Sequence, residues 1–387
     1  MIVVIADDIT GAAEIAGVCL RYDLTVSFGI DTIPNEVTDV CVVATDSRSL
    51  SESDAFLTHS QLAKAIYSQS PTLVFKKCDS VLRGYVLTEL SAMLEESQLS
   101  KVLLQPANPA TGRCIRNGIY YVGNEKIENT GFSIDPDFPA KNSSVQELLK
   151  TRSKKFSEKL DIHCSKITQL NANGLFLPDC ASVDDLKSCV HLSTNETLLC
   201  GSAAFFEQII LKKGLAKTIS SNIETDLLLT DFLLIAGTTH PESNRFAEKL
   251  IQIGCPVERF PEHFLLEELN ENDFVDWLGE LKSKWNENKM LSIRISDKPA
   301  IFPDSQTELK SRLSRVSAYL LKNCDISELL IEGGATTYDI LNTLSFTTLT
   351  PMTELAPGVL RMKVNNTDNL WLTIKPGSYA WPEKITF

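Results

Sequence analysis

Apolar runs of strand length alternate along this chain with amphipathic stretches of helical length. This alternation favours an α/β fold, in which a mostly parallel sheet is flanked by helices and its strands are buried on both faces. A first series of expected strands covers 2–6, 40–44, 72–76, 101–105, 174–177 and 197–200. A second series covers 232–236, 257–260, 291–295 and 329–332. The pattern breaks around 214–231, so we expect two such domains, 1–228 and 229–387.

Two adjacent acids follow the first expected strand. Asp7 and Asp8 come directly after the apolar run 2–6, and Thr10 with Gly11 then opens an expected helix over 12–20. Binding groups in parallel α/β folds collect at the carboxyl ends of strands, where an unpaired carboxylate is costly to bury. The acids therefore indicate either a hydroxyl-rich or metal-linked substrate, or a solvated turn in which Asp or Thr caps the helix.

A second polar cluster follows the strand expected at 72–76. Lys77, Asp79, Ser80 and Arg83 lie within a few residues of one another. Lysine and arginine suit a carboxylate substrate, and Asp79 and Ser80 offer partners for hydroxyl groups. The alternative is a charged loop that leads into a helix with Arg83 on its solvent face.

Two more loops have a similar layout. The turn 44–48 displays Arg48, and the proline-rich loop 105–113 displays Arg113. Each of these is also compatible with a purely structural turn. The segment 120–140 is rich in turn residues and is expected to form a hairpin with an excursion over a site.

The second half of the chain carries glycine loops. The loop 235–241 precedes an expected helix over 242–253, and the loop 331–337 precedes one over 338–344. Small residues at such turns expose backbone N–H groups at a helix N-terminus, which suits phosphate. With 375–379 they predict a phosphate cradle that matches neither the P-loop nor the dinucleotide fingerprint. His240 is either a ligand contact or a helix-start residue with a local hydrogen bond.

Composition narrows the class of partner. The net charge of −13 argues against nucleic acid, and an anionic ligand would need a local basic pocket. The ten cysteines form no CxxC pair and the five histidines show no metal-ligand spacing, which indicates a reduced chain without a dedicated zinc site. No apolar run suits a membrane span or a secretory signal, so we expect a cytoplasmic protein.

In combination, these motifs resemble the four-carbon acid sugar kinase family. The resemblance covers nearly the whole chain and rests on 6–12, 77–84, 106–113, 333–336, 356–359 and 375–379. Members of this family phosphorylate threonate, erythronate or 3-oxo-tetronate at the 4-hydroxyl with ATP. The resemblance implies an N-terminal sugar-acid domain, a C-terminal nucleotide domain and an active site in the cleft between them. ATP and Mg²⁺ are the implied cofactors, and a homodimer is one option for the oligomeric state.

The resemblance also implies site residues. The sugar acid would be bound by Asp7, Asp8, Arg48, Lys77, Asp79, Ser80, Arg83 and Arg113. The nucleotide would be bound by Gly237, Thr238, His240, Gly333, Gly334, Ala335, Thr336 and Gly377. We expect Asp8 to accept or orient the proton of the 4-hydroxyl, with Asp79 as the second candidate. The chain departs from the family pattern at 238–240, where many members have a serine-rich turn, and at Ala335, where a glutamate is common.

Several functions remain open at this point. The acid could be of the D-threonate or D-erythronate type, and the enzyme could instead be a 3-oxo-tetronate 4-kinase or a 4-hydroxythreonine kinase. A hydroxy-acid dehydrogenase would share the α/β layout, although the chain has no GxGxxG motif. A non-catalytic sugar-acid sensor would share the basic pocket, but the intact Asp8, Asp79 and glycine turns argue against it.

Overall fold

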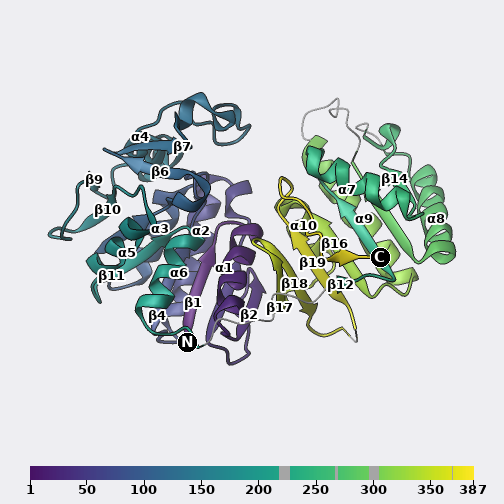
Figure 1. Ribbon diagram of the computed structural model, residues 1–387, viewed down its shortest axis with the longest axis horizontal. Helices are drawn as coiled ribbons and strands as arrows, with labels where there is room; N and C mark the ends of the chain where they lie inside the picture. The colour runs from purple at the N-terminus through teal and green to yellow at the C-terminus, as the bar shows by residue number, and fades with distance from the viewer. Residues whose placement is uncertain (218–226, 266–268, 296–304, 368) are drawn as a thin grey trace. The chain divides into compact units, whose positions relative to one another are not determined.

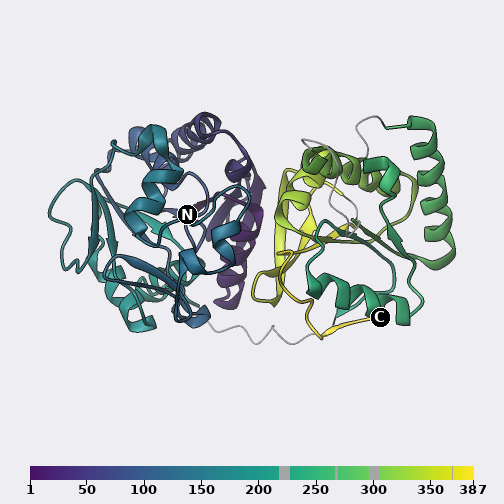
Figure 2. The ribbon, with the colours of Figure 1, turned by 90° about the horizontal axis from the view of Figure 1, so that it is seen from above.

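The structure is a computed structural model that describes residues 1–217, 227–265, 269–295, 305–367 and 369–387. The chain forms two compact units (Figures 1 and 2). Unit 1 comprises Met1–Thr25 and Asp31–Ile219, and unit 2 comprises Val26–Ile30 and Ser220–Phe387. The break in the sequence pattern at 214–231 includes 218–226, which lie outside the described residues. The domain boundary near residue 228 therefore stays a prediction.

Unit 1 is built on a parallel sheet with the strand order β3-β1-β4-β11-β5-β10-β9. Its strands are β1 (Ile2–Ala6), β3 (Val40–Ala44), β4 (Leu73–Lys77), β5 (Lys101–Gln105), β9 (Ile162–Ser165), β10 (Gly174–Pro178) and β11 (Thr197–Gly201). Every residue of β1, β3, β10 and β11 is buried. Strands of this kind need cover on both faces, which explains why the sequence shows unbroken apolar runs.

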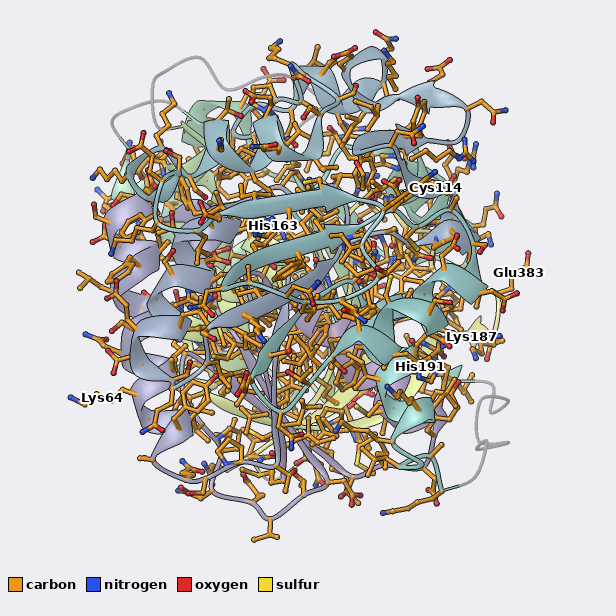
Figure 3. All side chains as sticks on the ribbon, turned by 90° about the vertical axis from the view of Figure 1, so that its left-hand side faces the viewer. Lys64, Cys114, His163, Lys187, His191 and Glu383 are labelled. Carbon is orange, nitrogen blue, oxygen red and sulfur yellow. The ribbon has the colours of Figure 1, made fainter. Side chains whose placement is uncertain are left out.

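Two groups of helices pack against the sheet of unit 1. They are α1 (Ile9–Arg21), α2 (Glu52–Tyr67), α3 (Val86–Glu96), α4 (Val145–Arg152), α5 (Val183–Leu192) and α6 (Ala203–Lys212). Helix α6 packs against both α1 and α5, while α2 packs against α3 and α3 against α4. Their outer faces carry solvated side chains, such as Lys64 on α2 and Lys187 and His191 on α5 (Figure 3).

A small antiparallel sheet extends from unit 1. It consists of β6 (Arg113–Arg116), β7 (Ile119–Val122) and β8 (Glu125–Lys126). The short 3₁₀ turns Ile127–Asn129 and Gly131–Ile134 follow it. The turn-rich segment 120–140 was expected to form a hairpin with an excursion, and the structure has this arrangement.

Unit 2 has a mixed sheet. Parallel pairing joins β14-β15-β13-β16-β19, and antiparallel pairing continues through β18 and β17 to β2. Its strands are β2 (Val26–Ile30), β13 (Phe232–Ala236), β14 (Val257–Arg259), β15 (Met290–Arg294), β16 (Glu328–Glu332), β17 (Thr348–Ala356), β18 (Val359–Val364) and β19 (Trp371–Lys375). Strand β2 thus comes from the first tenth of the chain and pairs with β17 of unit 2.

The helices and the C-terminal tail complete unit 2. The helices are α7 (Pro241–Gln252), α8 (Glu271–Asn288), α9 (Ser305–Asn323) and α10 (Gly334–Thr343), with a 3₁₀ turn at Glu262–Leu265. Near the C-terminus, β20 (Ile385–Thr386) pairs with β12 (Leu227–Leu228). Trp381 is buried in the core and its ring centroid lies 5.3 Å from that of Phe246, so the tail is anchored to α7.

The predicted fold class is confirmed, because both units have a mostly parallel sheet flanked by helices. Two expected helix starts were placed too late: α1 begins at Ile9 rather than at 12, and α10 begins at Gly334 rather than at 338, since the glycine turn itself forms the first turn of α10. All ten cysteines are free and eight of them are buried, as expected of core thiols. In the described part of the chain, the helices lack the combination of length and apolar character that a membrane span requires.

Gly201 provides a test of the packing in unit 1. A Cβ added there would lie 2.2 Å from the backbone oxygen of Gln105 on the neighbouring strand. Because a backbone atom of β5 cannot move aside, we expect Gly201→Ala to destabilise the protein by about 2 kcal/mol or more. Urea unfolding measures this loss. Gly131→Ala is the control, since an added Cβ meets open space there, and an equal loss in both variants would contradict the prediction.

Candidate functional site

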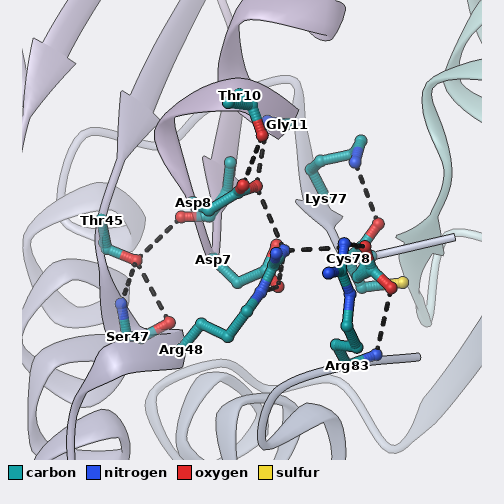
Figure 4. A network of polar contacts seen from close by, with 12 residues as sticks. Asp7, Asp8, Thr10, Gly11, Thr45, Ser47, Arg48, Lys77, Cys78 and Arg83 are labelled. Atoms are coloured by element: carbon teal, nitrogen blue, oxygen red, sulfur yellow. Dashed lines mark hydrogen bonds and ion pairs between the residues drawn. The ribbon is translucent and has the colours of Figure 1, made fainter. Parts of the chain in front are cut away.

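The carboxyl ends of β3, β1 and β4 lie side by side, because β1 pairs in parallel with both neighbours. The turns that follow these strands gather polar side chains into one group, which we call the strand-end cluster (Figure 4). It consists of Asp7, Asp8, Arg48, Lys77, Asp79 and Arg83, all of which were proposed from the sequence as substrate-binding residues. The cluster carries three acids and three bases, so its electrostatics depend on how they pair.

Asp8 has two roles in this cluster. Its side chain caps α1, accepting a hydrogen bond from the Gly11 backbone N–H at 2.9 Å and another from the Thr10 hydroxyl. The capping role considered from the sequence is therefore observed, but the turn is not solvated, because Asp7 is buried and Asp8 is only partly exposed. The same carboxylate lies 3.2 Å from Nη2 of Arg48. Burial raises the pKa of Asp8, but Arg48, Lys77 and the capping hydrogen bonds outweigh it, so the pKa lies below its usual value.

Asp7 behaves differently although it is the adjacent residue. Its Oδ2 accepts hydrogen bonds from Nη2 and Nε of Arg48, at 2.8 and 3.2 Å. Its Oδ1 is buried and has no hydrogen-bond partner in the described part of the chain. Burial raises the pKa of Asp7 and Arg48 opposes this only in part. The two neighbouring acids thus have pKa values shifted in opposite directions, which is the pattern of acid and base pairs in enzymes.

Asp79 is the most strongly paired acid of the cluster. Its Oδ1 accepts a hydrogen bond from Nη2 of Arg83 at 2.8 Å and lies 3.9 Å from Nη2 of Arg48. Its Oδ2 accepts the backbone N–H groups of Val81 and Arg83 at 3.0 and 3.2 Å. Burial raises the pKa of Asp79, but the two guanidinium groups hold it well below its usual value. Asp79 is therefore ionised at neutral pH.

Lys77 is held against the start of α1. Its Nζ donates a hydrogen bond to the Cys78 carbonyl at 3.0 Å and lies 3.5 Å from the Glu14 carboxylate. Burial lowers the pKa of Lys77, yet Glu14 and the acids of the cluster raise it above its usual value. A Cβ added at Gly11 would lie 2.7 Å from Oδ1 of Asp8 and 2.9 Å from Nζ of Lys77. A side chain at this position would therefore have to displace the Asp8 carboxylate and the Lys77 ammonium.

Ser80 and Arg113 meet beside the strand-end cluster. Nη1 of Arg113 donates a hydrogen bond to the Ser80 hydroxyl, and the hydroxyl of the buried Tyr120 donates one to the Ser80 carbonyl. The ring of Phe132, in the excursion, lies 6.0 Å from the guanidinium carbon of both Arg83 and Arg113. Within the described residues, Arg113 forms no ion pair with a carboxylate, so its charge is available to a ligand.

The glycine loops of unit 2 also come together. β16 pairs in parallel with both β13 and β19, so their carboxyl ends are adjacent. A Cβ added at Gly237 would lie 1.9 Å from Oγ1 of Thr336, and one added at Gly377 would lie 3.1 Å from Thr238. Gly333 has a φ of 103°, which favours glycine. The sequence-proposed residues 237, 238, 333–336 and 377 therefore line one edge of the sheet.

His240 lies at the start of α7. Its Nδ1 accepts a hydrogen bond from the Glu242 backbone N–H at 3.3 Å, so it caps this helix. This is the local role that was the alternative to a ligand contact. Pro241 follows as the first helical residue, where its missing N–H costs nothing.

A buried charged group lies at the base of the glycine loops, and the sequence did not single it out. Glu332, at the end of β16, is fully buried and accepts hydrogen bonds from the Ser243 hydroxyl and from Nε1 of Trp381 at 2.5 Å. Nζ of Lys375 lies 3.7 Å from the same carboxylate. Burial lowers the pKa of Lys375 in spite of Glu332. Glu332 directly precedes a glycine turn and Lys375 a proline-glycine turn. This position is the one feature of the sequence that could have pointed to the two residues.

Comparison with known proteins identifies the family. Residues 2–209 match the family model described as the sugar-binding N-terminal domain, which is more than half of the 387 residues. The chain belongs to the four-carbon acid sugar kinase family. The match covers the whole strand-end cluster of this family member and most of unit 1.

Curated relatives carry kinase names. The chain is 29% identical over 154 residues to a D-threonate kinase of Bordetella bronchiseptica, covering 38% of each chain. It is 31% identical over 160 residues to a D-erythronate kinase of Heliobacterium modesticaldum, covering 40% of this chain and 36% of the relative. The matched region thus spans less than two fifths of the length of these relatives.

Solved structures support the fold over the whole chain. The crystal structure of a Haemophilus influenzae protein of the DUF1537 family aligns with 99% of this chain and 98% of its own length. The TM-score is 0.73 and the identity is 17%. At this identity the likeness concerns the fold alone. Both units of the family member therefore have the arrangement of secondary structure found in that protein.

The pairing of Asp79 predicts a specific pH dependence of stability. A carboxyl whose pKa is depressed in the folded state adds stability above its unfolded pKa of about 3.9 and loses it as the pH falls toward the folded value. We expect Asp79→Asn to lower the free energy of unfolding at pH 7 by roughly 3 kcal/mol, because Arg83 and Arg48 lose a buried partner. The difference from wild type should stay constant from pH 8 to 5 and narrow below about pH 4.

Urea unfolding of both proteins across this pH range measures the difference. Asp184→Asn is the matched control, because its carboxylate is 86% exposed and pairs with the exposed Lys187 on the same helix. If the Asp79→Asn difference were as large at pH 3 as at pH 7, the assigned pKa shift would be wrong.

Proposed function

We propose that this protein is an ATP-dependent kinase that phosphorylates the 4-hydroxyl of a four-carbon sugar acid. Unit 1 would bind the acid at the strand-end cluster, and unit 2 would bind the nucleotide at its glycine loops. The single observation that carries the proposal is the set of Asp7, Asp8 and Asp79 around Arg48 at adjacent strand ends, with Asp7 and Asp79 buried and Asp8 partly exposed. The kinase names of the relatives support the same reaction class.

A sugar acid matches the chemistry of this cluster. Asp8 and Asp79 are ionised and can accept hydrogen bonds from hydroxyl groups, and Oδ1 of Asp7 has no partner among the described residues. The guanidinium of Arg113 can bind a carboxylate with two parallel hydrogen bonds. Lys77 adds a second positive charge close to Asp8. A polyhydroxy acid of four carbons offers both kinds of partner on a short skeleton.

Asp8 is the proposed acceptor of the proton from the reacting hydroxyl. In the reaction, the 4-hydroxyl oxygen forms a bond to the γ-phosphorus of ATP, the bond to the ADP oxygen breaks, and the proton passes to Asp8. The low pKa of Asp8 keeps it ionised, so it orients the hydroxyl and takes its proton only as the new bond forms. Asp79 remains the second candidate for this role.

The glycine loops fit a nucleotide triphosphate. The absence of side chains at Gly237 and Gly377 makes room for Thr336 and Thr238, so the loops pack closely together, and the first turn of α10 presents backbone N–H groups. The described residues contain no group of three His, Cys, Asp or Glu side chains suited to a metal ion. Mg²⁺ would therefore be bound mainly through phosphate oxygens and water, and would neutralise phosphate charge.

Asp8→Asn tests the reaction and the role of Asp8 together. Asparagine caps helices as well as aspartate does, so the variant removes the charge and keeps α1 in place. We expect wild type to release ADP with Mg²⁺-ATP and at least one of D-threonate, L-threonate, erythronate, 3-oxo-tetronate and 4-hydroxythreonine. In Asp8→Asn, kcat for that acid should fall by about 10²- to 10⁴-fold.

A coupled ADP assay measures both proteins, with Asp184→Asn as the control that should keep full activity. Glycerate, which has no fourth carbon, should give no turnover above the background hydrolysis of ATP. Absence of turnover on every acid, together with oxidation of an acid by NAD, would favour the dehydrogenase over the kinase.

Gly237→Ala tests the nucleotide site separately. The added Cβ would displace Thr336 and with it the first turn of α10. We expect the Kd for a non-hydrolysable ATP analogue to rise by at least about tenfold, and the Kd for the sugar acid to stay the same. Calorimetry measures both. Gly279→Ala on α8 is the matched control, because an added Cβ meets open space there, and unchanged nucleotide binding in Gly237→Ala would contradict the assignment.

A further inference from the structure

A buried ion pair lies under the strand-end cluster and has no role in the reaction described above. Lys76 on β4 and Glu89 on α3 are both fully buried, and Nζ of Lys76 lies 2.9 Å from Oε2 of Glu89. Removing two charges from water is costly, and apolar residues of similar size would often fill such a space at least as favourably. The net stability that the pair provides is therefore small compared with the cost of burying two charges. Its hydrogen bonds indicate which turns of the site it contacts.

Glu89 reaches the turn that carries Arg48. Its Oε1 accepts a hydrogen bond from the Ser47 hydroxyl at 2.6 Å. Ser47 is fully buried and begins the 3₁₀ turn Ser47–Ser49, whose second residue is Arg48. Thr45 holds the same turn, since its hydroxyl donates to the Ala6 carbonyl at 2.8 Å (Figure 4). Glu89 thus holds the turn through Ser47 and thereby orients the Arg48 side chain.

Lys76 reaches the turn that follows β4. Its Nζ donates a hydrogen bond to the carbonyl of Lys77 at 2.9 Å, just before the chain turns toward Asp79. His59 lies 3.9 Å from Glu89 and adds no charge, because burial lowers its pKa to about 4. One carboxylate therefore connects the turn after β3 to the turn after β4.

We propose that Glu89 is a positioning residue for the sugar-acid site. Through Ser47 it orients Arg48, and through Lys76 it fixes the backbone at Lys77, so that the two cations keep the spacing that the acid requires. This inference rests on the proposed function. It predicts that loosening Glu89 weakens acid binding while the nucleotide site stays intact.

Ser47→Ala is the informative variant. Glu89→Ala would leave the Lys76 ammonium buried without its partner and endanger folding. Ser47→Ala keeps the ion pair and removes the link to the Arg48 turn, together with the 3.2 Å contact between the Ser47 and Thr45 hydroxyls. We expect the KM and the Kd for D-threonate or D-erythronate to rise at least about tenfold, because a small displacement of a binding group has a large effect. The KM for ATP should remain unchanged. Ser47→Thr, which restores a hydroxyl, should recover most of the affinity.

The matched control is Ser91→Ala on α3. Ser91 is also buried, but its hydroxyl has no hydrogen-bond partner in the described part of the chain. This variant should keep wild-type kinetics and wild-type affinity for the acid. Steady-state kinetics, calorimetry with both acids and thermal unfolding are measured on all four proteins.

The outcomes separate the inference from the proposed function. An active wild type whose Ser47→Ala variant keeps the same KM and Kd for the acid would overturn the positioning role alone. Equal losses in Ser47→Ala and Ser91→Ala, matched by equal losses of stability, would also overturn it, because they would show a merely structural effect. A wild type that binds neither acid and has no turnover would overturn the proposed function itself.

Discussion

Charge balance at the ends of β1, β3 and β4 is the constraint on which unit 1 depends. Asp7 is buried, and Nη2 of Arg48 lies 2.8 Å from it, 3.2 Å from Asp8 and 3.9 Å from Asp79. A single guanidinium therefore links the turns after all three strands. Because a buried carboxylate without a partner is costly, none of these turns can move without disturbing the other two.

The same balance limits what can bind. Arg48 and Arg83 already have carboxylate partners within the protein, so a simple anion gains little by approaching them. Under the proposed function, a ligand that also brings hydroxyl donors would satisfy the acids at the same time as its own carboxylate binds Arg113. In a chain of net charge −13, this local arrangement would favour a polyhydroxy acid over inorganic anions. Selectivity would then come from the match of donors and acceptors, not from net positive charge.

The sequence predicted the parts of this arrangement that depend on neighbouring residues. Apolar runs that end in Asp7 or Lys77 mark strand ends, and the parallel order of the strands brings them together. The sequence could not predict the role of Glu89. A single acid in a helix gives no sign that its side chain is buried, or that it accepts a hydrogen bond from Ser47, which lies 42 residues earlier in the chain. The start of α10 was placed too late, since glycines were interpreted as a loop. Strand β2 was missed because its partner β17 lies more than 300 residues along the chain and the two segments pair only in the folded state.

The two units use the same principle with different chemistry. Each places a buried acid beside a buried lysine near the carboxyl end of a parallel strand: Glu89 of α3 lies beside Lys76 of β4 in unit 1, and Glu332 of β16 lies beside Lys375 of β19 in unit 2. Above this base, unit 1 presents charged side chains, which suits a small ligand with many polar groups. Unit 2 presents glycine turns and backbone N–H groups, which suits the uniform charge of phosphates. Buried ion pairs of this kind would hold the turns next to them in place. The residues of those turns can then differ between the two units without disturbing the strands.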